Sequence, residues 1–210
     1  MKHLTQFITE KQNFIVNNKL NKSYSNKTKI LYTPKTKLEL TELLNKLLNS
    51  GETNLNCIDV SKIENMNSLF IKYNDIDNID ISEWDVSNVV NMNMMFYNCK
   101  KFNCDLSNWD VSNVKTMNGM FNSCENFDCD LSKWDVSNVE SMYEMFGNCK
   151  KFTGKGLENW DVSKVVDFDK MFLYCENLDV DLNNWKVSRD ATKRHMFSKC
   201  TSLIKTPYWY

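Results

Sequence analysis

The chain has 210 residues, a length that suits one ordinary domain or two small ones. Its 26 Lys and Arg residues nearly balance 27 Asp and Glu residues, so the net charge of −1 argues against a nucleic-acid-binding surface spread over the molecule. Apolar residues make up 42% and aromatic residues 12% of the sequence, which excludes a disordered chain. No run approaches 18 apolar residues, so we expect no membrane insertion.

Residues 1–28 are predicted to form an N-terminal helix followed by a polar linker. The first 20 residues lack the apolar core and the small-residue cleavage site that are typical of a signal peptide, and no Cys stands where a lipoprotein anchor needs one. We therefore expect a cytoplasmic protein, with surface or virion association by another route as the alternative. In a reducing compartment its eight Cys residues are expected to be thiols.

Residues 29–57 are interpreted as an N-terminal capping segment built around an amphipathic helix over residues 37–50. Thr36 is the predicted N-cap residue, and Gly51 follows the last helical residue. The leucines recur at the three- and four-residue spacing of one helical face. This helix is expected to cover the first repeat.

A repeat of about 25 residues organises residues 58–208. Trp recurs in steps of 25, 25, 26 and 25 residues, and a Met-Phe pair and a Cys follow each Trp at fixed distances. The consensus is W-D-V-S-N-V-x-x-M-x-x-M-F-x-x-C-x-x-F-x-x-D-L-S-x. A weaker copy that begins at Ile58 raises the total to six repeats. The tail Pro207–Tyr210 falls where a further Trp is due and is predicted to form an aromatic cap over the end.

Each repeat is predicted to be a three-turn helix followed by a short strand. Val89, Met92, Met95, Phe96 and Cys99 follow one another at steps of three residues or one, which indicates a single helical stripe. The D-L-S-N-W segment that follows reads as a short extended piece. The predicted fold class is therefore α/β.

One such unit cannot bury its stripe alone, so the repeats are expected to stack into a short solenoid. Parallel strands stack about 4.8 Å apart. Packed helices need about 8–10 Å. This mismatch predicts a curved, leucine-rich-repeat-like arc with strands on the concave face and helices outside.

The copies WDVSNVVNMNMMFYNCKKFNCDLSN and WDVSNVKTMNGMFNSCENFDCDLSK closely resemble the BspA-type leucine-rich repeat. This 25-residue form occurs in mycoplasma lipoproteins, in other bacterial surface proteins and in phage proteins. The resemblance covers residues 58 to about 208. It implies a solenoid used for protein binding and adhesion, with no catalytic residues.

Two repeated features leave alternatives open. The Trp row either packs inward or lines the concave face, where an exposed aromatic ladder would bind a protein or a glycan. Cys104 and Cys129 are placed side by side along the strand region, where they form either a disulfide or reactive thiol pair or simply two small strand-edge residues.

Catalysis has little support in the sequence, because there are only two His residues and no recognised catalytic or phosphate-binding motif. We predict no enzyme, no cofactor and no metal site. The expected function is a protein–protein interaction module that binds a protein partner through its concave strand face. The alternatives are a structural or attachment subunit of a larger assembly, such as a surface or virion part, and a carbohydrate-binding adhesin.

Residues that vary between copies on the predicted concave face are expected to set binding specificity. The repeats specify a scaffold, so they identify neither the partner nor the oligomeric state. The candidate binding residues are Ser107, Asn108, Ser132, Lys133, Gly154, Lys155, Gly156, Glu158, Asn159, Asn183 and Asn184.

Overall fold

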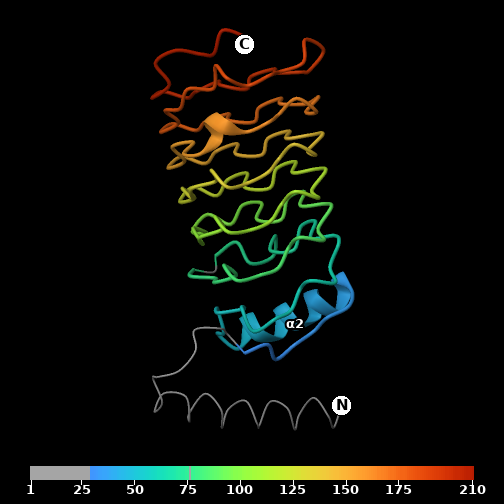
Figure 1. The fold of residues 1–210 in the computed structure, drawn as a ribbon. Coiled ribbons are helices and arrows are strands. Elements are labelled where there is room, and N and C mark those ends of the chain that lie inside the picture. Colours follow the sequence, from blue (N-terminus) through green and yellow to red (C-terminus); the bar gives the residue numbers. More distant parts are fainter. Residues whose placement is uncertain (1–28, 76) are drawn as a thin grey trace, which may run out of the picture.

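The computed structural model describes residues 29–75 and 77–210 as a stack of coils with a helix at one end (Figure 1). Its regular elements are the α-helix α2 (Lys37–Asn49) and the short 3-10 helix η1 (Leu157–Asn159). The coils are joined by isolated parallel bridges, each of which links a residue to one 25 or 26 positions further along. The longest series of bridges runs Asn65, Asn91, Thr116, Ser141, Asp167 and Thr192.

Helix α2 confirms the helix predicted over residues 37–50. The Thr36 hydroxyl accepts a hydrogen bond from the Glu39 amide at 3.2 Å, which satisfies one of the free donors of the first turn. The helix lies across the first coil (Figure 1) and buries one face against it. That face consists of Leu40, Leu44, Leu47 and Leu48.

The three-turn helices predicted within the repeats are absent from the described residues, and this prediction is wrong. The segments form successive tight turns instead: the Met95 amide donates to the Met92 carbonyl at 3.2 Å, three residues back. The Phe96 amide donates across to Met120 in the next coil at 2.9 Å. Amides therefore alternate between a turn bond and an inter-coil bond. A chain of such turns brings every third residue inward, so it produces the same stripe as a helix.

Left-handed residues explain why these segments cannot be helical. Met94 has φ 54° and Asn98 has φ 62°, and a right-handed helix requires negative φ at every residue. The same two places carry a positive φ in later coils, as at Glu144 and Asn148. The backbone thus turns at fixed points in each repeat, and the amides that do not close a turn point toward the next coil.

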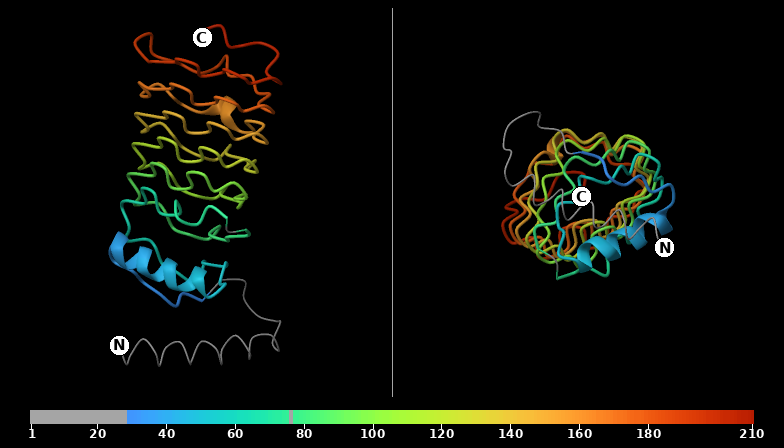
Figure 2. Two further views of the ribbon diagram at one scale, coloured as in Figure 1. Left: turned by 180° about the vertical axis from the view of Figure 1, so that it is seen from behind. Right: turned by 90° about the horizontal axis from the view of Figure 1, so that it is seen from below.

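The predicted short strand is also a turn. The Asp105 carboxylate accepts from the Ser107 amide at 2.9 Å, and the Trp109 amide donates to the Leu106 carbonyl at 3.0 Å. Without helices on one side and strands on the other, nothing spaces the two sides of a coil differently. Viewed along the stack, the coils lie over one another rather than along an arc (Figure 2). The predicted concave strand face is therefore not formed.

The core is a set of aromatic columns that run through the stack. The rings of Phe96 and Phe121 lie 5.5 Å apart and nearly parallel, at 8°. The rings of Trp160 and Trp185 lie 6.4 Å apart at 3°. Stacked, nearly parallel rings let each coil repeat the packing of the one before it.

The Trp row belongs to this core, which settles the alternative left open by the sequence. Trp84, Trp109, Trp134, Trp160 and Trp185 are only 2–4% exposed. Each indole N–H donates to a backbone carbonyl of the preceding coil, as Trp134 Nε1 does to Leu106 at 3.0 Å. The exposed aromatic ladder required by the carbohydrate-binding alternative is therefore missing from the row.

The C-terminal tail extends the Trp column. Trp209 stacks 6.0 Å from Trp185, and its Nε1 donates to the Leu182 carbonyl at 2.8 Å. The Tyr210 ring meets the Phe197 ring edge-on, with centroids 5.0 Å apart. These contacts cover the aromatic core at the last coil.

Substitution of Trp134 by Phe should lower the free energy of unfolding by about 1–3 kcal/mol, because it removes the buried hydrogen bond to Leu106 and leaves a cavity. Urea denaturation followed by intrinsic fluorescence measures the change. Trp209→Phe is the matched control: it removes the same atoms at the half-buried end of the column, and a smaller loss is expected. Equal losses of unfolding free energy in the two variants would contradict a larger contribution from the fully buried indole hydrogen bond.

Candidate functional site

The W-D-V-S-N side of each coil is occupied by structural hydrogen bonds. The Asp85 carboxylate accepts from the Ser87 amide at 3.1 Å and from the Ser87 hydroxyl at 2.6 Å. The Asn113 amide group then donates to the Ser87 carbonyl of the coil before it, at 2.7 Å. Because the same bonds recur in the neighbouring coils, these side chains hold the turns and join the coils.

A second side of the stack carries side chains that differ from coil to coil. We call it the variable face, formed by the outward residues of segments 90–98, 115–123, 140–148, 166–174 and 191–199. The longest series of parallel bridges runs along it. Inward Met and Phe side chains keep its backbone alike in each coil, so outward positions can change without altering the fold. One column of this face reads Asn93, Asn118, Tyr143, Asp169 and Arg194, with Asp169 buried, and the next reads Met94, Gly119, Glu144, Lys170 and His195, with Gly119 buried.

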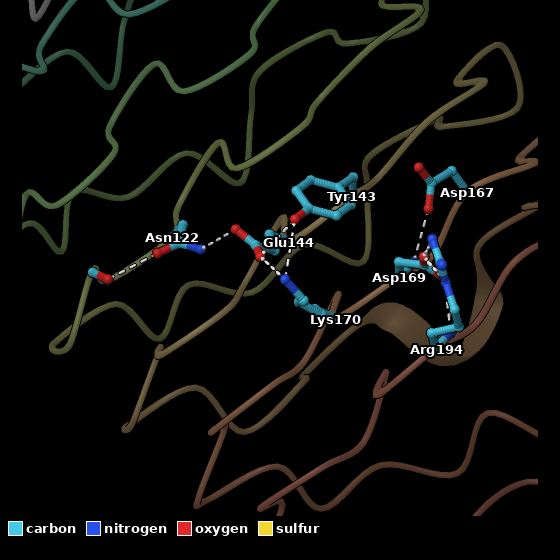
Figure 3. Close-up of polar contacts among 8 residues, drawn as sticks. Asn122, Tyr143, Glu144, Asp167, Asp169, Lys170 and Arg194 are labelled. Carbon is cyan, nitrogen blue, oxygen red and sulfur yellow. Dashed lines mark hydrogen bonds and ion pairs between the residues drawn. The ribbon is translucent and has the colours of Figure 1, made fainter.

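A polar network lies at the centre of the variable face (Figure 3). Glu144 accepts from the Lys170 ammonium at 2.9 Å and from the Tyr143 hydroxyl at 2.9 Å. Its other oxygen accepts from the Asn122 side chain at 3.2 Å. The Lys170 nitrogen also lies 5.5 Å from the centre of the Tyr143 ring, within range of a cation–π contact. The network fixes a carboxylate, an ammonium and an aromatic ring in one place.

A separate ion pair lies beside this network and reaches the last coil (Figure 3). Arg194 Nη2 lies 2.6 Å from Asp169 Oδ2, and the Arg194 backbone amide donates to Asp169 Oδ1 at 2.7 Å. Burial of Asp169 acts to raise its pKa, but the hydrogen bonds from Arg194 outweigh it, so the pKa of Asp169 is lowered. Asp169 is 5% exposed while Arg194 is 80% exposed, so the guanidinium faces outward.

The chemistry of this network is that of a fixed recognition surface. The hydrogen bond to Glu144 raises the pKa of Lys170, which keeps its ammonium charged and unsuited to act as a base. Glu144 accepts bonds at both carboxylate oxygens. The arrangement can present charge and aromatic surface to a partner without rearranging.

The residues predicted to bind a partner lie elsewhere, along the D-L-S-x turns and the Gly154–Gly156 insertion, and six of them line two open hollows. A hollow of about 400 Å³ brings together Ser107, Ser132 and Lys133 with Cys104 and Cys129. Another of about 300 Å³ includes Glu158, Asn159 and Asn184.

The side chains around these two hollows also contact one another. Lys133 donates to Asn108 Oδ1 at 2.8 Å, and Lys155 pairs with Asp130 at 2.9 Å. The Asn183 side chain donates to Asp181 at 2.7 Å. Several of the predicted binding groups therefore already have partners within the fold.

Gly154 and Gly156 are not surface binding residues, because the structure buries both. Gly156 has φ 92°, and a Cβ atom there would lie 2.2 Å from the Ser132 backbone nitrogen. A Cβ at Gly154 would lie 2.7 Å from the Val180 side chain. The extra residue of the 26-residue copy is thus accommodated by glycines that allow close contact between coils.

Cys104 and Cys129 are free thiols in the structure, as are the other six Cys residues. Burial raises the pKa of each of these two thiols to about 11. Cys129 Sγ accepts from the Leu106 amide at 3.2 Å, a structural contact. The Cys of the M-F-x-x-C element is also structural, since Cys124 donates to the Phe96 carbonyl of the preceding coil at 3.0 Å.

The predicted sites omitted the network on the variable face. Tyr143, Glu144 and Lys170 stand at x positions of M-x-x-M-F-x-x-C, between the residues of the predicted helical stripe. The variation at these positions was visible in the sequence. Recognising it as a site required the coil geometry that stacks one x position over the next.

Residues 29–75 and 77–210 carry neither a metal-site cluster nor a membrane-spanning helix. No group of three or more His, Cys, Asp or Glu side chains there is arranged to hold a metal ion. None of the helices in this part of the chain has the length and apolar character needed to cross a membrane.

Replacing Gly156 by Ala should lower the free energy of unfolding by more than about 3 kcal/mol, because the new Cβ overlaps backbone of the neighbouring coil at a positive φ. Gly51→Ala is the control, since Gly51 has φ 80° with nothing within 4 Å of the added atom. It should cost about 1–2 kcal/mol from backbone strain alone. Urea denaturation compares the two, and equal costs would argue against close contact at Gly156.

Alkylation of Cys104 by iodoacetamide should be slow at pH 8 and should accelerate about ten-fold per pH unit up to pH 10. A pKa of about 11 leaves only a small thiolate fraction below that value, and the thiolate is the reactive form. Peptide mapping by mass spectrometry measures the rate. The urea-unfolded chain is the control, with an ordinary thiol pKa near ~8.5. Fast, pH-independent labelling of the folded protein would contradict the raised pKa of this partly buried thiol.

The comparisons with known proteins give a family and no described activity. A family model described as "Mycoplasma protein of unknown function, DUF285" matches residues 39–155 and again 128–208. No curated protein and no solved structure matches the chain. The two matched regions together cover most of the sequence, including most of α2 and the coils that carry the variable face. The chain therefore belongs to the DUF285 family.

Proposed function

We propose that this protein is a non-enzymatic protein-interaction module, a leucine-rich-repeat-like solenoid that binds a protein partner through its variable face. This surface replaces the concave strand face expected from the sequence. The proposal agrees with the use of the BspA-type repeat, which the sequence resembles, in protein binding.

One observation carries the proposal: the outward residues of neighbouring coils differ while the residues that build the coils stay the same. Over three successive coils, one column changes from Gly119 to Glu144 to Lys170. The inward residues beside them remain Met and Phe. A scaffold that holds unlike side chains in fixed rows offers a specific pattern for recognition.

The chemistry of the described residues favours binding over catalysis. Burial raises the pKa of Cys104, Cys129 and Cys200 to about 11, which suppresses their nucleophilicity at neutral pH. Lys170 is held in its charged form by Glu144. These groups act as positioned donors and acceptors, which is the requirement for specificity at an interface.

The test compares affinity capture by the full chain with capture by a variant of the variable face. Tyr143→Asn, Lys170→Gly and Tyr174→Asn introduce residues that earlier coils carry in the same columns, at Asn118, Gly119 and Asn98, so the fold should tolerate them. A protein partner is captured from source-cell lysate by the original chain. The amount captured by the face variant should be at least ten-fold lower, a loss of about 1.4 kcal/mol in binding free energy, as quantified by mass spectrometry.

The matched control changes the side of the D-L-S-x turns by exchanging two residues of one column, Lys133→Asn and Asn184→Lys. Capture by this variant should match that of the original chain. If the control variant loses capture of the partner while the face variant keeps it, the binding surface lies on the D-L-S-x turns instead. Thermal unfolding of each variant verifies that the fold is intact.

A further inference from the structure

Two thiols of neighbouring coils meet at the open hollow of about 400 Å³ on the side of the D-L-S-x turns. Cys104, in the coil that begins at Trp84, and Cys129, in the next coil, each stand five residues before the following Trp. Stacking therefore places them in one column. Both thiols are free, with Cys129 buried and Cys104 half-buried. The fold brings together two sulfur atoms that 25 residues separate in the sequence.

The two sulfur atoms repeat the same local geometry. Each thiol lies close to the carbonyl oxygen of the residue that follows it, at 3.7 Å for Cys104 and 3.6 Å for Cys129. Each sulfur also accepts a backbone amide from the preceding coil, that of Ile81 for Cys104 and that of Leu106 for Cys129. Because these contacts are equivalent, the two sulfur atoms are displaced from one another by one step of the stack.

The step between these coils suits a bridging ion better than a disulfide. The rings of Phe96 and Phe121, in the same two coils, lie 5.5 Å apart, and the sulfur atoms are separated by a comparable step. A disulfide brings its sulfur atoms to about 2.0 Å, which would require the coils to close up. A metal–thiolate bond is roughly 2.3 Å long, so an ion between two thiolates spans about 4.6 Å. A small side-chain rotation covers the remaining difference.

Access distinguishes this pair from the Cys column of the M-F-x-x-C elements. Cys124 and Cys149 are fully buried, and their thiols donate to carbonyls of the preceding coil at 3.0 Å, so an ion cannot reach them. Cys104 and Cys129 line an open hollow, which gives an ion a path to them. The amides that donate to their sulfur atoms favour the thiolate form. The Asp105 carboxylate, 3.7 Å from the Cys129 sulfur, adds negative charge beside the pair.

We propose that Cys104 and Cys129 bind a soft monovalent metal ion, copper(I), as a bridge between two coils. Thiolate sulfur selects copper(I), and two ligands in line satisfy this ion. A structural zinc site needs four ligands. Within residues 29–75 and 77–210 no group of three or more metal-binding side chains is formed, so the pair fits an ion that two thiolates satisfy. Both thiols release their protons as the ion binds, and the cation offsets the repulsion between the two thiolates.

This site lies on the side of the D-L-S-x turns, apart from the variable face, and the proposal does not depend on the function proposed above. The sequence predicted no metal site because the two cysteines are far apart along the chain. Binding of the ion can fail while the variable face still captures a partner, and the reverse also holds.

The test is an anaerobic titration of the full, reduced chain with copper(I), supplied as its acetonitrile complex and competed by the chelator bicinchoninate. We expect one ion per chain by native mass spectrometry. X-ray absorption should show sulfur as the only ligand, with a coordination number of two.

Cys104→Ser and Cys129→Ser, alone and together, should lower the affinity for copper(I) by at least about 100-fold, because loss of an outer-shell contact alone costs about 10- to 100-fold. Ser keeps an acceptor for the amide of the preceding coil, so these variants should fold, as thermal unfolding verifies. Cys200→Ser is the matched control. It removes another half-buried thiol, outside the pair, and should leave binding of the ion unchanged.

Any of three results would overturn the proposal. If the double Ser variant binds copper(I) as tightly as the original chain does, other residues hold the ion. If X-ray absorption shows three or more ligands, the bridge between two thiolates is not formed. If zinc(II) binds to the pair as tightly as copper(I) does, the hollow is a general cation site.

Discussion

Along the variable face, every second amide donates to a carbonyl of the next coil, as Phe96 does to Met120 and Phe121 to Met145, each at 2.9 Å. Most of the remaining amides close turns within their own coil, while those of Asn118, Tyr143 and Arg194 donate to a side chain of the preceding coil. This division requires left-handed backbone at the same points of each repeat, and it sets the distance between coils. Phe96 and Phe121 can therefore stack at 5.5 Å, and the outward residues form straight columns. The straight stack, the aromatic core and the variable face all depend on these inter-coil bonds.

Much of the architecture could be predicted from the sequence because the buried apolar residues recur at regular spacings. The 25-residue period, the inward Met, Phe and Cys positions and helix α2 all follow from spacing and capping residues such as Thr36. The conformation between them could not be predicted. Turn bonds and helices both place every third residue inward, and residues such as Met94 and Glu144 give no sign that their φ is positive. A glycine stands at only one position of that column, Gly119.

The candidate site was missed for a related reason. The helical interpretation placed these segments outside the arc and the specificity residues on a concave strand face. When the segments are turns instead, Tyr143, Glu144 and Lys170 come from adjacent coils onto one surface and bond to one another. The glycines of the insertion caused the opposite error. They occur in one copy only and were predicted to bind a partner, but Gly156 is buried because it touches the Ser132 backbone. Variation between copies therefore marks a surface only after burial is known.

The 26-residue copy shows where a coil can change its circumference. Its extra residue is taken up near Gly154 and Gly156, on the side of the D-L-S-x turns, while the bridge from Ser141 to Asp167 keeps its place in the series. Insertions on that side lengthen a coil without shifting the hydrogen-bond register of the variable face. An insertion between Met142 and Cys149 would instead displace each inter-coil bond that follows it. Repeats of this kind are thus free to gain length on one side only, and this asymmetry lets a duplicated array diverge in size while its rows of outward side chains stay aligned.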